Sequence, residues 1–172
     1  FSLPTLYSIG KHASHSQLTD VHGVTGRAVP LTGIREVDAM RHLDTYWYLD
    51  IAHYGYRLDQ GQSSVVFFPL YPLVFRGVHE VTGLPLGLAA QVVSSVCALA
   101  AGGLMALFAY FFFLGAQEPA RQARLYAGFA VAVLFFHPMG FFLHAAYTES
   151  LFLCLSMLLY LAYQRERWAM VG

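Results

Sequence analysis

The chain has 172 residues, of which 57% are hydrophobic, 16% aromatic and only 12% charged, and its net charge is zero. A soluble domain of this length would have to hide that apolar surface in a core of limited volume, so the composition favours the lipid bilayer as solvent. The balanced charge provides no basic surface and excludes a nucleic-acid partner.

Both ends of the chain look cut, because it starts at Phe1 and stops at Gly172, just past a charged cluster. We therefore expect the N-terminal part of a longer protein, with further spans after residue 172. Two cysteines, Cys97 and Cys154, lie in long apolar runs. This placement predicts packing roles rather than a disulfide or a metal site.

The first 83 residues are predicted to form a loop that carries amphipathic or interfacial helices. Residues 1–34 lack periodicity and are expected to be a loop. An imperfect amphipathic helix is predicted over 34–54, with Gly55 ending it. The segment 65–78 is apolar but contains two prolines, so an interfacial or re-entrant segment is expected there instead of a regular helix.

Transmembrane helices are predicted over the rest, 84–172, near 86–114, 125–143 and 147–164. No charged residue occurs from 84 to 117, a run long enough to cross a bilayer. A polar turn is expected over 117–124. Four small residues spaced by four along the first helix should let another helix approach closely: Ala90, Ser94, Ala98 and Gly102.

The second apolar run is interrupted by His137 and Pro138. The third has only 13 uncharged residues between Leu151 and Tyr163, too few for a span at about 1.5 Å each, so its helix must extend further. The fold class is therefore all-α, a polytopic membrane helical bundle with an extracytoplasmic loop.

Arginines predict the orientation of this bundle. Two short segments carry them on one side of the predicted membrane: Arg121, Arg124, Arg165 and Arg167. The positive-inside tendency places that side in the cytoplasm. Residues 1–83 and the turn at 144–150 then share the extracytoplasmic face.

Two acids are the first candidates for chemistry. Asp44 lies among aromatic residues, where desolvation would make it a better proton acceptor. Alternatively, Asp44 and Asp50 form the wet face of an interfacial helix. Glu149 is bounded by apolar runs, and it either has a functional role at membrane depth or lies in the first turn of a helix.

Histidine is the third informative residue type, with eight in the chain. His12 and His15 have ligand-like spacing, but a solvated loop is the better interpretation. His137 and His144 flank the extracytoplasmic end of the second span. They could bind an anionic headgroup or, equally, serve the backbone freed by Pro138.

Three blocks of the sequence resemble PIG-V-type mannosyltransferases when they are taken in order. The blocks are HLDTYWYLDIAHYGY at 42–56, FFPLYP at 67–72, and FHP at 136–138 followed by FF at 141–142 and AYTESL at 146–151. The resemblance covers about residues 35–163. Two positions depart from the family pattern, since Leu43 replaces a tryptophan and His137 replaces an asparagine.

The resemblance implies a GT-C-like multi-span glycosyltransferase that transfers mannose from dolichyl- or polyprenyl-phosphate mannose to a glycolipid acceptor. Eukaryotic members of this family add the second, α-1,6-linked mannose in GPI-anchor biosynthesis. The protein is then an integral multi-pass protein of the plasma membrane in a bacterium, or of the endoplasmic reticulum membrane in a eukaryote. No cofactor or metal ion is predicted.

The resemblance also assigns the catalytic base to Asp44, in the first extracytoplasmic loop. A sugar hydroxyl is a poor nucleophile, so a carboxylate must take its proton, whereas the phosphate leaving group needs no acid. Further residues are substrate-binding candidates: Arg41, Trp47, Arg76, His137, His144 and Glu149. The alternatives are another lipid-linked-sugar transferase of the same architecture, or a transporter fragment with both acids on an ion path.

Overall fold

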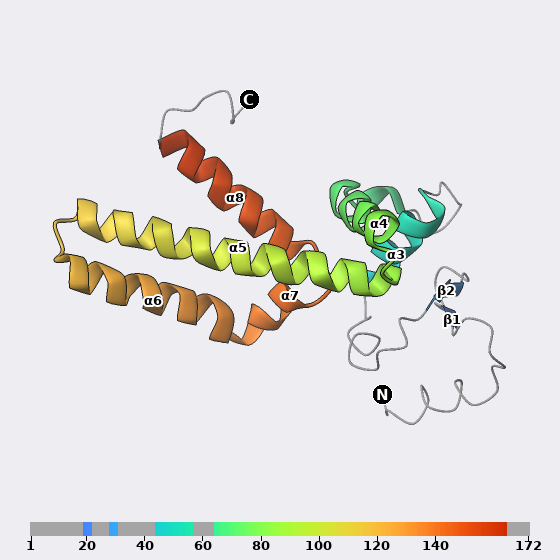
Figure 1. Ribbon diagram of the computed structural model, residues 1–172, viewed down its shortest axis with the longest axis horizontal. Helices are drawn as coiled ribbons and strands as arrows, with labels where there is room; N and C mark the ends of the chain where they lie inside the picture. The colour runs from blue at the N-terminus through green and yellow to red at the C-terminus, as the bar shows by residue number, and fades with distance from the viewer. Residues whose placement is uncertain (1–18, 22–27, 31–43, 57–63, 165–172) are drawn as a thin grey trace. The chain divides into compact units, whose positions relative to one another are not determined.

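The computed structural model describes residues 19–21, 28–30, 44–56 and 64–164, and in these ranges the chain is helical apart from one short strand pair (Figure 1). The chain divides into two compact units, 1–90 and 91–172, and each is described by itself.

The strand pair lies in unit 1. Strands β1 (Thr19–Val21) and β2 (Ala28–Pro30) are antiparallel, with Asp20 opposite Val29. The prediction of a loop throughout 1–34 is therefore wrong for these six residues. Strands of three residues are too short for alternation to be visible in the sequence.

Two helices follow in unit 1. Helix α3 spans Thr45–Tyr54 and ends at Gly55, whose φ of 81° is readily adopted only by glycine. The amide of Gly55 donates to the carbonyl of Ile51 at 2.8 Å. The predicted helix over 34–54 is thus confirmed for residues 45–54. Residues 34–43 lie outside the described ranges.

Helix α4 spans Leu70–Thr82, so the expectation that prolines prevent a regular helix over 65–78 is wrong. A short 3₁₀ turn, η1 (Ser64–Val66), precedes it. Pro69 is the N-cap residue and Pro72 lies in the first turn, where backbone N–H groups have no intrahelical partner to lose. The helix ends at Gly83, which is left-handed at φ 72°.

Unit 2 is built on helix α5, Leu86–Gly115, whose thirty residues extend about 45 Å. It is the one described helix that is by itself long and apolar enough to cross a membrane. Only 22% of its most apolar stretch is buried, unlike the core helix of a soluble protein.

Helix α6 spans Ala120–Phe136 and continues, after a 69° bend, into η2 (Pro138–Gly140) and α7 (Phe141–His144). Together α6 and the η2–α7 segment are apolar enough to be a second, broken span. The polar turn is shorter than expected, because α6 begins at Ala120 and contains Arg121 and Arg124. These residues are good helix formers, and Pro119 directly precedes them.

Helix α8 spans Glu149–Gln164 and is apolar, although shorter than a full span. Tyr147, just before α8, contacts Ser94 near the start of α5, and Tyr160, near the end of α8, contacts Phe108 further along α5. The two helices therefore run parallel. Figure 1 shows α6 running back beside α5 and α8 passing it in the same direction as α5. The starts of α5 and α8 and the end of α6 therefore lie at one end of unit 2.

The small-residue stripe on α5 is where its neighbours come close. All four of its members are buried: Ala90, Ser94, Ala98 and Gly102. A methyl group on Gly102 would lie 2.6 Å from the Phe135 ring of α6, whereas one on Gly103 would meet nothing within 4 Å. The predicted packing role of the stripe is confirmed at Gly102.

We expect Gly102→Leu to destabilise the protein by about 1–3 kcal/mol, because the new side chain must displace the Phe135 ring. Gly103→Leu is the matched control, with the same change in helix propensity at an open position. Thermal unfolding in detergent measures both. Equal unfolding temperatures for the two variants would contradict close packing at residue 102.

Candidate functional site

The acid predicted to be catalytic, Asp44, stands at the start of α3. It is the N-cap residue and is exposed, and its carboxylate makes no capping hydrogen bond to the helix. The expectation that Asp44 is desolvated is therefore wrong in this unit.

The buried acid of α3 is Asp50, which is 0% exposed. One of the two interpretations of the sequence placed Asp50 on a wet face together with Asp44, and this is wrong for Asp50. The two lie six residues apart, which is not a whole number of helical turns, so they face different directions. Asp50 also falls within a run of five buried residues, 48–52, where helical periodicity gives no signal.

An aromatic cluster holds α3 against the start of α4. Phe67 stacks on Trp47 with ring centroids 5.5 Å apart, and Tyr48 meets the edge of Phe67 at 5.2 Å. Tyr48 also contacts Tyr71 at 5.4 Å, and Tyr71 contacts Phe75 at 5.1 Å. Edge-to-face pairs of this kind add to simple area burial. The cluster thus fixes the helix whose first turn begins at Asp44.

Trp47, a substrate-binding candidate, therefore has one ring face covered by Phe67 and remains half-buried. Tyr71 is almost fully buried, and its hydroxyl donates to the carbonyl of Ala90 at 3.1 Å. Sequence reasoning did not single out Tyr71, although its hydroxyl ties α4 to the first turn of α5.

Arg76 makes two contacts within unit 1. Its Nη1 donates to the carbonyl of Ala52 at 3.1 Å, near the end of α3, and its Nε donates to Glu80 at 2.8 Å. A guanidinium at the C-terminal end of a helix satisfies a free carbonyl and opposes the helix dipole. These contacts favour a structural role for Arg76. Arg41 lies outside the described residues.

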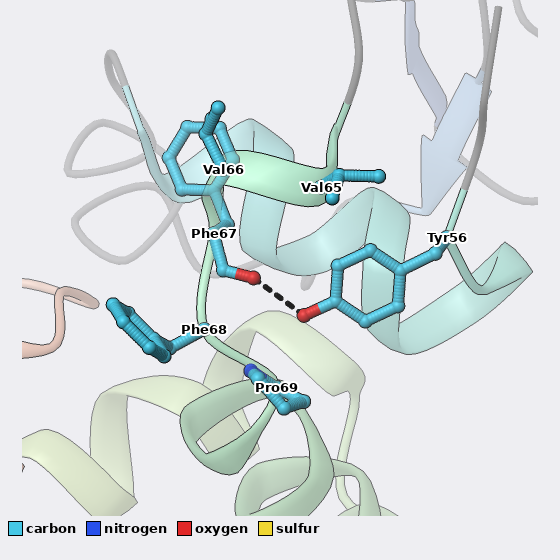
Figure 2. A pocket seen from close by; sticks show the side chains of 6 residues that line it. All are labelled: Tyr56, Val65, Val66, Phe67, Phe68 and Pro69. Atoms are coloured by element: carbon cyan, nitrogen blue, oxygen red, sulfur yellow. Dashed lines mark hydrogen bonds between the residues drawn. The ribbon is translucent and has the colours of Figure 1, made fainter.

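A shallow hollow of about 420 Å³ lies beside this cluster (Figure 2). Its lining is apolar apart from one phenol: Tyr56, Val65, Val66, Phe67, Phe68 and Pro69. The Tyr56 hydroxyl donates to the carbonyl of Phe67 at 2.5 Å, and burial raises the pKa of this phenol, which keeps it protonated as a donor. Because the described residues of its lining include no acid, the hollow suits an apolar group rather than a sugar.

Unit 2 contains the other candidates. Glu149 is the first residue of α8 and is exposed, so its negative charge offsets the helix dipole. His144 ends α7, stacks on Phe135 at 5.5 Å, and accepts a hydrogen bond at its carbonyl from Gln91. Asp44 and Glu149 belong to different units, so their placement in a single site stays a prediction.

His137 serves the backbone next to Pro138, which is one of the two roles that the sequence predicted for it. Its Nδ1 accepts a hydrogen bond from the amide of Met139 at 3.1 Å, which caps the short 3₁₀ turn after the bend. An asparagine side chain can accept from the amide two residues on in the same manner. The departure from the resembled family at this position therefore preserves the cap.

Ser150 and Gln91 were also missed. Ser150 is fully buried, and neither its hydroxyl nor Oε1 of Gln91 has a hydrogen-bond partner among the described residues. For Gln91 the available signal was a polar residue inside an apolar run. In the described ranges, no three side chains of histidine, cysteine, aspartate or glutamate come together as a metal-binding group would require. Cys97 and Cys154 are free thiols.

Comparison with known proteins identifies the family. No curated protein and no solved structure matches the chain. The model of the family described as Mannosyltransferase (PIG-V) matches residues 28–170, which include both units' candidate residues. The chain belongs to the PIG-V mannosyltransferase family, and it is thus a glycosyltransferase that takes mannose from a sugar donor to an acceptor.

Proposed function

We propose that the protein is a multi-pass membrane enzyme that transfers mannose from dolichyl- or polyprenyl-phosphate mannose to a glycolipid hydroxyl, as in GPI-precursor synthesis. Asp44 is the base. The observation that carries this role is the position of its carboxylate, exposed and without a capping bond, at the end of a helix held by the aromatic cluster.

The reaction needs one proton acceptor. The acceptor oxygen attacks the anomeric carbon of mannose, the bond from that carbon to the phosphate oxygen breaks, and polyprenyl phosphate leaves as an anion. Asp44 takes the hydroxyl proton as the new bond forms. The Trp47–Phe67 stack keeps α3, and hence Asp44, in a fixed orientation.

Exposed apolar side chains support a lipid environment for both units. At the start of α4, Phe68 is 81% exposed beside the apolar hollow, as expected for a segment that meets the bilayer surface or a lipid chain. In unit 2, Phe129 and Phe152 are 70% and 72% exposed. A multi-pass arrangement gives these residues acyl chains to contact.

The transporter alternative has less support. An ion path needs acids near the middle of the membrane. The described helices of unit 2 have no acid in their interiors, since α5 and α6 contain none and Glu149 is at the very start of α8.

The arrangement of unit 2 also supports the proposed orientation. Because α8 is parallel to α5 and α6 is antiparallel to it, the α5–α6 turn and the end of α8 lie at the same end. Arg121 and Arg124 belong to that end, which we place in the cytoplasm. Glu149 and His137 are then at the extracytoplasmic end.

We expect an impermeant thiol reagent to label Thr82→Cys from outside intact cells and to label Gln117→Cys only after permeabilisation. Both positions are exposed; Thr82 precedes the start of α5 and Gln117 follows its end. The background should lack Cys97 and Cys154, which are free thiols. Equal labelling of the two positions without permeabilisation would contradict the orientation.

Asp44→Asn should lower mannose transfer by about 100-fold or more while leaving the unfolding temperature unchanged, because the residue is exposed and makes no cap bond. The measurements are transfer from polyprenyl-phosphate mannose and thermal unfolding of the full-length protein in detergent.

Asp50→Asn is the paired variant, with the same chemical change at a fully buried position. We expect its cost to be mainly in stability, about 1–3 kcal/mol, because an amide donor replaces a buried acceptor. Wild-type turnover in Asp44→Asn together with a folded but inactive Asp50→Asn would assign the base to Asp50.

A further inference from the structure

His137 is held in one orientation at the break between α6 and η2. Its backbone is extended, at φ −61° and ψ 144°, and its ring folds back so that Nδ1 lies 3.1 Å from the amide nitrogen of Met139. The side chain is nevertheless exposed. The ring is therefore fixed at one nitrogen and accessible at the other.

The hydrogen bond decides which nitrogen carries the proton. A backbone amide can only donate, so Nδ1 must keep its lone pair, and the neutral imidazole then has its proton on Nε2. No group within the described ranges accepts a hydrogen bond from this Nε2–H. Residue 137 thus presents a single oriented donor.

The donor lies at the end of unit 2 where polar groups gather between apolar helices. Gln91 donates to the carbonyl of His144, and Ser94 donates to the carbonyl of Tyr147 at 3.2 Å. The hydroxyl of Ser150 is fully buried without a described partner. Polar side chains of α5 and α8 thus lie at the same end of the unit as the oriented donor.

We propose that Nε2–H of His137 donates a hydrogen bond to a phosphate oxygen of the lipid-linked sugar donor, with the Met139 amide orienting the ring. This inference rests on the proposed function, which supplies a lipid phosphate at the extracytoplasmic end. Hydrogen bonds to charged oxygens are strong enough that losing this one raises the Kd for polyprenyl phosphate by about 10- to 100-fold.

Three substitutions separate the donor from the cap. In His137→Asn, Oδ1 can accept from the Met139 amide and Nδ2–H can donate, so the variant should restore both functions. In His137→Asp, the carboxylate accepts from the same amide but cannot donate to a phosphate. His137→Ala removes both. The unfolding temperature should therefore fall only in His137→Ala, because the cap survives in the other two.

The test is binding of polyprenyl phosphate to the full-length protein in detergent, together with KM for polyprenyl-phosphate mannose. We expect His137→Asn to bind within about threefold of wild type and His137→Asp to bind at least 10-fold more weakly. Equal Kd values for the Asn and Asp variants, or weak binding by a folded Asn variant, would overturn the proposal.

The tautomer gives a readout that is independent of activity. In protein labelled with ¹⁵N-histidine, the signals lost in His137→Asn should include one unprotonated Nδ1 and one protonated Nε2. A protonated Nδ1 would overturn the proposal. If the wild type binds polyprenyl phosphate through His137 but transfers no mannose, the proposed function fails while this inference stands.

Discussion

Backbone polar groups at helix ends must find partners, and in apolar surroundings there is no water to supply them. This constraint accounts for most of the long-range side-chain hydrogen bonds in the described residues. In each case the side chain serves a backbone group at a helix end, a break or a connection. The side chains that do so at long range are Tyr56, Arg76, Gln91 and Ser94, and His137 does the same locally for the amide of Met139.

The same constraint explains how the chain accommodates the 69° bend between α6 and the η2–α7 segment. Pro138 ends the regular helix, and the Met139 amide that follows is satisfied by His137. Gly140 allows the chain to turn tightly, because a Cβ there would lie 2.5 Å from the carbonyl oxygen of Phe135. The Phe135 ring in turn packs on Gly102 and His144, so one aromatic side chain connects the bend to α5.

Long-range features of the sequence predicted the fold better than local ones. The absence of charge over 84–117 predicted the long apolar helix α5, because an uncharged apolar run of this length is typical of a helix able to cross a membrane. The break at His137–Pro138 was predicted from the proline that interrupts the second run. Helix α4 was not predicted, because the effect of Pro72 depends on where the helix starts, and only the cap at Pro69 decides this.

Burial of individual polar residues was the least predictable property of the site. Asp44 and Asp50 look alike in the sequence, yet one is exposed and the other is fully buried. Helix α3 packs against α4 and β2, and which of its residues such packing buries is a tertiary effect that the local sequence does not encode. Two of the aromatic residues that suggested desolvation of Asp44, Trp47 and Tyr48, instead pack on Phe67.

The candidate residues fall into two groups: those whose side chains already form hydrogen bonds within the protein and those with groups that form none in the described ranges. Arg76 donates hydrogen bonds to the carbonyl of Ala52 and to Glu80, so fewer of its N–H groups are available to a substrate. The carboxylates of Asp44 and Glu149 and Nε2 of His137 form no hydrogen bond within the described ranges, and all three residues are exposed. Two of these groups can accept a proton and the third can donate a hydrogen bond. Recognition of substrate in this family member is therefore best sought in polar groups that the helix ends do not use.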